Sequence, residues 1–303
     1  MPVRHFLTLT DLEHDEVIRL IELALRLKAW RKRGYRPALF EGRTLAMIFE
    51  KSSTRTRVSF EVAMAEGGGS AIFLSSRESQ LGRGEPPEDT ARVLSEMADA
   101  IMIRTFEHDI VRRFANAATV PVINGLTNSL HPCQLLADLT TYFEHRGEIR
   151  GRCVAWVGDG NNMCNSYIDA ADLMGFELRI ATPPGYEPAG LSTSRGAAQV
   201  SWMADPVAAV DGADLVVTDV WASMGQEEEA SRRRDAFRTY QVTSELMRKA
   251  ATDALFMHCL PAHRGEEVTA EVIDHPRSVV WDEAGNRLHA QKSLLDFLLR
   301  ARD

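Results

Sequence analysis

The stretch of sequence that decides the fold is TLAMIFEKSSTRTRVSFEVAMAE, residues 44–66. Its first six residues, 44–49, form an apolar run that is typical of a buried strand. The polar segment SSTRTR, residues 52–57, follows, and residues 57–66 are expected to form a helix. A strand that passes into a helix through a polar loop favours a parallel α/β sheet, in which ligands bind at the carboxyl ends of the strands.

The same alternation of strands and helices continues in both directions from this segment. An N-terminal helix is expected after a capping box formed by Thr10 and Glu13, and Gly34 ends it. In the first half of the chain we expect further strands at 71–74, 100–103 and 120–123, and helices at 88–98, 109–117 and 135–145. The pattern restarts after a linker at 146–151, with strands expected at 154–157, 178–181, 215–218, 255–257 and 279–281.

Two runs of alternating strands and helices predict two doubly wound parallel-sheet α/β domains that share a cleft. The expected boundaries are residues 1–147 for the first domain and residues 148–285 for the second. A final helix at 286–303 has no strand after it, so we expect it to pack back on the first domain.

Composition narrows the classes of function. The 303 residues carry a net charge of −8, which argues against a nucleic-acid partner. No apolar run reaches the ~18 residues that a membrane span needs, and the N-terminus has no signal-peptide pattern, so we expect a cytoplasmic protein. The four cysteines lack zinc-binding spacing, and we expect neither a metal ion nor a cofactor.

Residues 52–57 combine four hydroxyl groups and two guanidinium groups at the expected start of a helix. Backbone N–H groups at a helix N-terminus bind anions, and arginine contacts phosphate oxygens in a bidentate way. The segment therefore predicts a phosphate site, although it lacks the P-loop pattern. The alternative interpretation is a serine that caps the helix beside arginines exposed to solvent.

Further polar segments follow the other expected strands. They are Arg104, the segment HPCQ at 131–134, GDGNNMCNS at 158–166, DVWASMG at 219–225 and HCLP at 258–261. The glycine-rich segment has Met163 where a dinucleotide-binding loop needs its third glycine, so a nucleotide-dependent oxidoreductase is disfavoured. In the last segment, Cys259 as a nucleophile with a histidine base remains an alternative.

Taken in order, these segments resemble the aspartate and ornithine carbamoyltransferase family, over residues 49–294. The resemblance implies that the first domain binds carbamoyl phosphate, and that Arg104, His131 and the Thr56 hydroxyl stabilise charge on the carbonyl oxygen. The carbamoyl phosphate residues that it implies are Ser53, Thr54, Arg55, Thr56, Gln80, Arg104, His131, Gln134, Cys259, Leu260 and Arg287. Gly285 departs from the glutamate that is usual in the family.

The second domain resembles the ornithine-binding domain of that family. The resemblance implies that Asn162, Asp219, Ser223 and Met224 bind L-ornithine, and that Asp219 and Cys259 are catalytic together with Arg104 and His131. A carboxylate at Asp219 would repel aspartate. Putrescine or an N-acylornithine remains an alternative substrate, and a catalytically inactive binding protein is a third class of function.

The resemblance also implies how the chain assembles. It predicts a homotrimer, or a multiple of trimers, in which Gln80 of the segment SQLG at 79–82 reaches the site of a neighbouring subunit. It further predicts a cis peptide bond between Leu260 and Pro261.

Overall fold

The computed structural model describes residues 3–75, 84–192, 199–222 and 227–300 of the chain. The chain forms two compact units, the first made of Met1–Thr140 with Gly285–Asp303 and the second of Thr141–Ala284. Each unit holds one parallel sheet with helices. The predicted class, two parallel-sheet α/β units, is confirmed.

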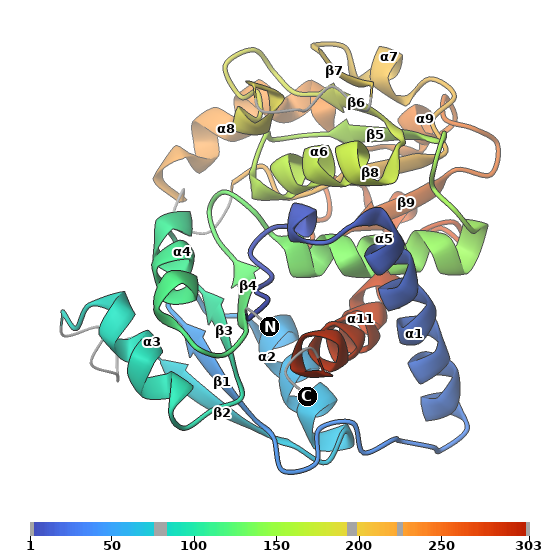
Figure 1. The fold of residues 1–303 in the computed structure, drawn as a ribbon. Coiled ribbons are helices and arrows are strands. Elements are labelled where there is room, and N and C mark those ends of the chain that lie inside the picture. Colours follow the sequence, from blue (N-terminus) through green and yellow to red (C-terminus); the bar gives the residue numbers. More distant parts are fainter. Residues whose placement is uncertain (1–2, 76–83, 193–198, 223–226, 301–303) are drawn as a thin grey trace. The chain divides into compact units, whose positions relative to one another are not determined.

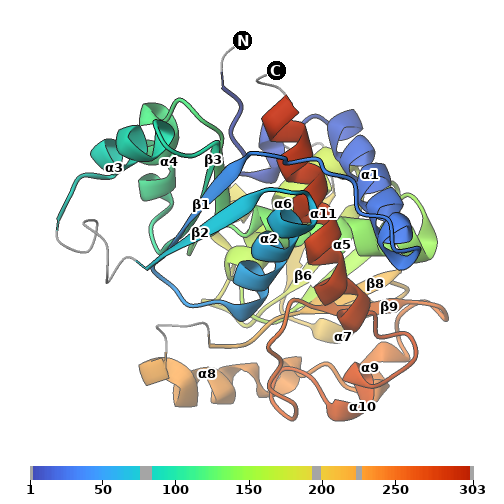
Figure 2. The same ribbon diagram turned by 90° about the horizontal axis from the view of Figure 1, so that it is seen from below.

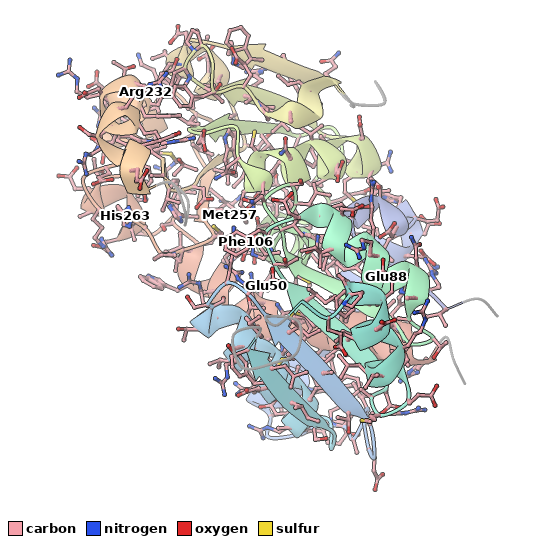
Figure 3. The ribbon with its side chains drawn as sticks, turned by 90° about the vertical axis from the view of Figure 1, so that its left-hand side faces the viewer. Glu50, Glu88, Phe106, Arg232, Met257 and His263 are labelled. Carbon is pink, nitrogen blue, oxygen red and sulfur yellow. The ribbon has the colours of Figure 1, made fainter. Side chains whose placement is uncertain are left out.

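The sheet of the first unit has four parallel strands in the order β2–β1–β3–β4. The strands are β1 (Thr44–Phe49), β2 (Ser70–Ser75), β3 (Ala100–Arg104) and β4 (Val122–Leu126). Phe49 at the end of β1 pairs with Arg104 at the end of β3. The loops after these strands therefore leave the sheet at the same edge, where Figure 3 shows Glu50 and Phe106 near each other.

Helices cover both faces of this sheet. Figures 1 and 2 show α3 and α4 on one face, and α2 with the C-terminal part of α11 on the other. The α3–α4 face is a core of branched apolar side chains, in which Ile48, Ile101 and Ile103 pack with Val111 and Phe114. The helices are η1 (Leu9–Asp11), α1 (His14–Lys32), α2 (Thr54–Glu66), α3 (Pro87–Ser95) and α4 (His108–Ala117).

The sheet of the second unit has five parallel strands in the order β7–β6–β5–β8–β9. The strands are β5 (Cys153–Val157), β6 (Glu177–Ala181), β7 (Val200–Met203), β8 (Leu215–Thr218) and β9 (Leu255–His258). The helices are α6 (Asn162–Met174), η4 (Ala189–Ser192), α7 (Pro206–Val210), η5 (Glu227–Glu229), α8 (Ala230–Phe237), η6 (Arg238–Tyr240), α9 (Ser244–Met247) and α10 (Ala270–Ile273).

Side chains of the central strand β5 alternate between two layers of helices. Trp156 packs toward α6, where its ring centroid lies 5.8 Å from that of Tyr167. Ala155 and Val157 belong to the opposite core, which includes Phe237 of α8. This alternation follows from the two-residue period of a strand and explains why β5 is an uninterrupted apolar run in the sequence.

Two helices contain the points at which the chain passes between the units: α5 (Pro132–Arg146) and α11 (Val280–Arg300). The strand predicted at 279–281 is wrong, because α11 begins at Val280. Only Ser278, before it, forms an isolated bridge with Phe256 of β9. A three-residue apolar run does not distinguish strand from helix, and Asp282 and Glu283 in the first turn favour the helix.

The structure differs from the sequence analysis in two other places. Strand β7 was not predicted, because Ser201 and Trp202 are exposed on this edge strand and the apolar run is interrupted. The capping box of α1 joins Glu13 and Glu16, not Thr10 and Glu13. The Thr10 hydroxyl instead hydrogen-bonds that of Thr8, at 2.8 Å.

In the part of the chain that the structure describes, no helix is long and apolar enough to cross a membrane.

Candidate active site

In the first unit, Ser53 caps the N-terminus of α2. Its Oγ accepts a hydrogen bond from the backbone N–H of Thr56 at 3.2 Å. Thr54 is exposed, Arg55 is half-buried and Thr56 is buried. The predicted phosphate loop is therefore a capped helix start that opens at the carboxyl end of β1, where free N–H groups favour an anion.

Two buried guanidinium groups converge on the hydroxyl of Thr56. Arg287 donates from Nη2 to Thr56 Oγ1 at 2.9 Å, and Arg104 donates from Nη1 to the same oxygen at 3.4 Å. Arg104 is 6% exposed and Arg287 is 2% exposed. Two cations held this close in a buried place form a region of strong positive potential, which suits a phosphate dianion.

Gln134 is fixed from both ends of its amide. Its Oε1 accepts from Nη1 of Arg287, and its Nε2 donates to Asp138 Oδ1 at 2.9 Å. Asp138 lies one turn further along α5 and was not predicted from the sequence. Its carboxylate determines which way the amide points, so it sets the hydrogen bond that Gln134 offers to Arg287.

His131 is buried at the start of α5. Burial lowers the pKa of His131 well below its usual value, and the guanidinium groups of Arg287, Arg104 and Arg55 lower it further. The ring is therefore neutral at physiological pH, and a neutral imidazole carries one N–H donor. The structure thus brings His131 into the field of the same three arginines that were predicted to bind carbamoyl phosphate.

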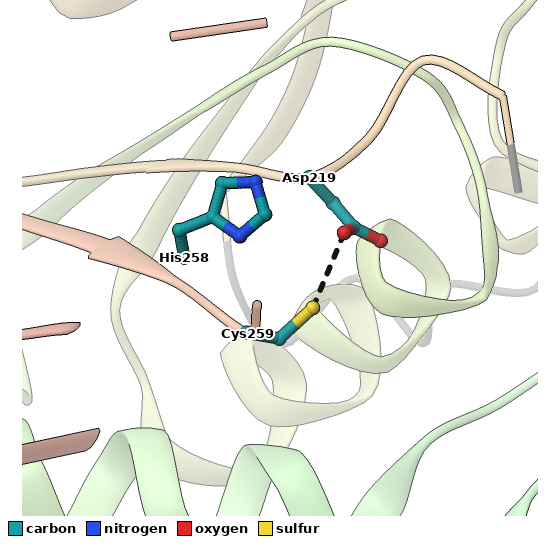
Figure 4. Close-up of side chains that lie close together, drawn as sticks. All are labelled: Asp219, His258 and Cys259. Carbon is teal, nitrogen blue, oxygen red and sulfur yellow. Dashed lines mark hydrogen bonds between the residues drawn. The ribbon is translucent and has the colours of Figure 1, made fainter. Parts of the chain in front are cut away.

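In the second unit, Asp219 follows β8 and is held by two neighbours. Its Oδ2 accepts from the amide of Asn161 at 2.8 Å, and its Oδ1 accepts from the Cys259 thiol at 3.2 Å. Figure 4 shows the contact between Asp219 and Cys259. The carboxylate is 7% exposed, and a buried carboxylate held in a fixed direction is a good partner for a cationic or amine group.

Both ring nitrogens of His258 are engaged. Its Nδ1 accepts from the backbone N–H of Leu260 at 2.9 Å, so Nε2 carries the proton and points toward Glu267 Oε1 at 3.1 Å. The Cys259 thiol donates to Asp219, and both ring nitrogens of His258 are held by other partners. The structure therefore gives no support to the alternative of a nucleophilic cysteine with a histidine base.

Atoms of Asp219, His258 and Cys259 lie within 4.8 Å of one another. All three side chains already have hydrogen-bond partners, so a metal ion bound here would have to displace some of these contacts. Next to it, the Leu260–Pro261 peptide bond is cis, as predicted, and Leu260 has φ +56°.

Asn161 and Asn162 begin α6 after the glycine-rich segment. The Asn161 side chain caps the helix by accepting from the N–H groups of Met163 and Cys164. Its amide therefore reaches Asp219 from a fixed position. This role of Asn161 was not predicted from the sequence. Asn162, the predicted ornithine contact, is half-buried in the first turn.

A buried ion pair in the second unit was also missed. Arg233 of α8 contacts Asp159 at 3.0 Å and donates to the Trp221 carbonyl at 2.8 Å. Burial raises the pKa of Asp159 to about 6, against the opposing effect of Arg233. The pair ties α8 to the loops after β5 and β8. No local pattern in the sequence indicates it, because the partners lie in different elements.

Gln80, Ser223 and Met224 lie outside the described residues, so the structure does not locate these three predicted contacts.

Comparison with known proteins matches both units. Residues 4–144 match the model of the aspartate/ornithine carbamoyltransferase carbamoyl-P binding domain. Residues 150–298 match that of the Asp/Orn binding domain. The chain is 63% identical over 301 residues to ornithine carbamoyltransferase of Methylococcus capsulatus, with 99% of this chain and 100% of the relative covered.

Solved structures agree with these matches. Ornithine carbamoyltransferase from Burkholderia thailandensis superposes with a TM-score of 0.92 at 53% identity, over 99% of this chain and 100% of that one. The enzyme from Pyrococcus furiosus gives a TM-score of 0.92 at 52% identity, over 96% of each chain. The chain therefore belongs to the aspartate/ornithine carbamoyltransferase family, on the branch of the ornithine carbamoyltransferases.

Proposed function

We propose that this chain transfers the carbamoyl group of carbamoyl phosphate to the side-chain amine of L-ornithine, giving L-citrulline and phosphate. The observation that carries the proposal is the Asp219 carboxylate, held between the Asn161 amide and the Cys259 thiol. A fixed, buried carboxylate favours an amine co-substrate and repels a second carboxylate, which disfavours aspartate. The relatives at 60–63% identity carry the same activity in their names.

The phosphate half-site lies in the first unit. The start of α2 binds the phosphate through N–H groups, hydroxyls and the Arg55 guanidinium, and Arg287 supports it by holding Thr56 and Gln134. Gln134 contacts the carbamoyl amine, and the backbone at Cys259 and Leu260 accepts from the same group. The proposed carbamoyl phosphate residues are Ser53, Thr54, Arg55, Thr56, Arg104, His131, Gln134, Cys259, Leu260 and Arg287.

The chemistry is direct attack by the amine. The lone pair of the ornithine side-chain nitrogen forms a bond to the carbamoyl carbon, and negative charge builds on the carbonyl oxygen. Arg104, neutral His131 and the Thr56 hydroxyl donate to that oxygen. The bond from carbon to the phosphate oxygen then breaks, phosphate leaves with the bonding electrons, and the nitrogen loses a proton.

The ornithine half-site lies in the second unit. Asp219 and Cys259 orient the amine, and the Asp219 carboxylate accepts its proton, while Asn162, Ser223 and Met224 contact the amino-acid portion. Since the amine must reach the carbamoyl carbon, the proposal requires both half-sites to act on the same pair of substrates.

Product formation tests the proposal. The purified chain is incubated with carbamoyl phosphate and one of four amines: ornithine, putrescine, N-acetylornithine or aspartate. Ornithine should give the highest kcat/KM by far. Equal or better turnover of putrescine or N-acetylornithine rejects the substrate assignment, and absence of any carbamoylated product rejects the activity.

The proposal includes a homotrimer in which Gln80 acts in the site of a neighbour. An apolar surface of the first unit supports it: Ile72 and Phe73 of the edge strand β2 are 50% and 36% exposed, and Val58 of α2 is 50% exposed. Exposed apolar side chains at a sheet edge are typical of an assembly surface. Light scattering that shows an active monomer would rule the trimer out.

A cytoplasmic location is the last part of the proposal. The four cysteines are all free, and Cys133, Cys153 and Cys164 are buried. Free thiols suit a reducing compartment, and fractionation of cells that express the chain tests the assignment.

A further inference from the structure

Gly285 lies in the interior of the long helix α11. Glycine is a poor helix former, because its backbone loses more conformational freedom on folding than that of any other residue. Space does not require a glycine here. Gly285 is exposed, and a Cβ atom added to it would meet no atom of the described residues within 4 Å. An alanine, or the glutamate that is usual in the family, would fit, so the glycine needs another explanation.

The position of Gly285 along the chain supplies that explanation. The second unit ends at Ala284, and the chain enters the first unit again at Gly285. The helix is unbroken across this boundary, as Figure 2 shows for α11. A continuous helix that belongs to two compact units resists a change in their relative position unless one of its turns bends readily. A glycine in the helix interior lowers that resistance.

The turns on either side of Gly285 are anchored separately. Before it, Oε2 of Glu283 accepts from the backbone N–H of His258 at 2.9 Å, inside the second unit. After it, Arg287 donates to Oγ1 of Thr56 at 2.9 Å, inside the first unit. Both anchors are buried, since Glu283 is 1% and Arg287 is 2% exposed. Gly285 is thus the middle residue of the short segment between two fixed points of α11.

The other crossing between the units also lies in a locally weakened helix. Within α5 the chain leaves the first unit at Thr140 and enters the second at Thr141. The Thr140 hydroxyl donates to the Leu136 carbonyl of the preceding turn at 2.7 Å. A threonine that bonds in this way weakens its helix slightly and often bends it. Both helices that cross the boundary therefore carry a residue there that makes bending easier.

We propose that Gly285 is a hinge in α11 that lets the two units change their relative position during turnover. This inference rests on the proposed function, in which both half-sites act on one pair of substrates, while substrates still have to enter and products to leave. The Glu283 anchor holds the end of β9, which leads to Cys259, and the Arg287 anchor belongs to the phosphate half-site. Bending at Gly285 therefore changes the position of one half-site relative to the other.

The first test replaces the glycine with alanine, a stronger helix former. Gly285→Ala should raise the Tm by about 1–4 °C, because helix interiors favour alanine over glycine. The same preference changes an equilibrium between a straight and a bent helix by about two- to fivefold. Turnover passes through both forms, so kcat with ornithine should fall by about that factor. Kd for inorganic phosphate should stay unchanged, since the first unit alone binds this probe.

Three further variants separate the hinge from overall stability. Gly285→Glu introduces the residue usual in the family and should also lower kcat. Ala29→Gly, at an exposed alanine of α1, makes the reverse exchange inside the first unit, so it should lower the Tm and leave kcat unchanged. The double variant Ala29→Gly/Gly285→Ala should return the Tm toward the wild-type value but keep the reduced kcat. A kcat that recovers together with the Tm would reject the hinge, because kcat would then follow stability.

Hydrogen exchange tests the hinge without relying on activity. In the wild type without substrates, backbone amides of residues 285–289 should exchange faster than those of residues 292–296, further along the same helix. Gly285→Ala should slow exchange at 285–289 by about two- to fivefold and leave 292–296 unchanged. Equal exchange in the two segments, or a kcat of Gly285→Ala equal to that of the wild type, overturns the inference. If the wild type makes no citrulline, the proposed function fails, and hydrogen exchange still decides whether α11 bends at Gly285.

Discussion

Arg287 and Thr56 are 231 residues apart in the sequence, yet Nη2 of Arg287 donates to Oγ1 of Thr56 across 2.9 Å. The same guanidinium holds Gln134 through its other terminal nitrogen. One side chain of α11 therefore fixes two residues of the phosphate half-site that the sequence places on α2 and α5.

We expect Arg287→Met to raise KM for carbamoyl phosphate by about tenfold to a hundredfold, the range for loss of hydrogen bonds to a charged group. Initial rates at saturating ornithine and varied carbamoyl phosphate give this KM. Arg248→Met, at an exposed arginine of the second unit, is the control. A KM within about threefold of wild type, too small for a lost charged contact, would show that Arg287 does not support phosphate binding.

Arg55→Ala should nearly abolish activity while the far-UV circular dichroism and the Tm stay close to wild type, because Arg55 is half-buried and its proposed partner is the phosphate. Arg57→Ala is the matched control. Arg57 is exposed and pairs with Glu61 at 2.8 Å, and a surface pair of this kind contributes about 0.2–1 kcal/mol. Activity of Arg55→Ala within about threefold of wild type would contradict the proposed role.

Cys259→Ser should remain active, because a serine hydroxyl can donate to Asp219 as the thiol does. Asp219→Asn should lose about tenfold to a hundredfold or more in kcat/KM for ornithine, since it removes the charge that orients the amine. Steady-state kinetics and intact-protein mass spectrometry measure both variants. A carbamoylated enzyme in the wild type, together with an inactive Cys259→Ser, would restore the nucleophilic interpretation.

The free energy of unfolding should decrease as the pH is lowered, because of His289. Burial is the main cause that lowers its pKa from 6.5 to about 4; Lys28, Arg31 and Lys292 contribute in the same direction, and Glu66 opposes them. Below pH 6.5 the unfolded chain binds a proton that the folded chain does not. This contribution is therefore complete above pH 6.5 and is lost as pH falls toward about 4; it amounts to no more than about 3 kcal/mol.

Urea unfolding between pH 7 and pH 4.5 measures this effect. His289→Gln should flatten the decline in the free energy of unfolding, whereas His275→Gln, at an exposed histidine, should leave the decline unchanged. Parallel curves for the wild type and His289→Gln would assign the decline to other groups.

The sequence predicted those parts of the fold that depend on local patterns. The apolar runs of β1 and β8 are buried along almost their whole length, so both strands were placed at their observed bounds. Strand β7 lies at a sheet edge and lacks such a run. Residues 279–281 carry a run that packs as the start of a helix, and only tertiary packing decides between the two.

The candidate site also divides into residues that a local pattern predicts and residues that only tertiary packing brings together. Residues with a family motif, such as Arg104 and His131, could be named from the sequence. The contact between Lys51 and Asn128 joins residues 77 positions apart, and the Arg233–Asp159 pair joins two different elements. Buried partners that hold a motif residue in place carry no pattern of their own, so only the folded chain identifies them.

The first unit is discontinuous, since residues 285–303 complete a unit that residues 1–140 begin. A ribosome that adds about 5–20 residues per second needs roughly seven to thirty seconds to translate the stretch between them. Throughout that interval the growing chain has the loop between β1 and α2, with Ser53, but lacks Arg287. The side chains that pack around Leu294, Leu295 and Leu298 of α11 in the folded chain remain uncovered. The four strands of the first unit are therefore made long before the helix that covers them, and its phosphate half-site becomes complete only after translation has passed α11.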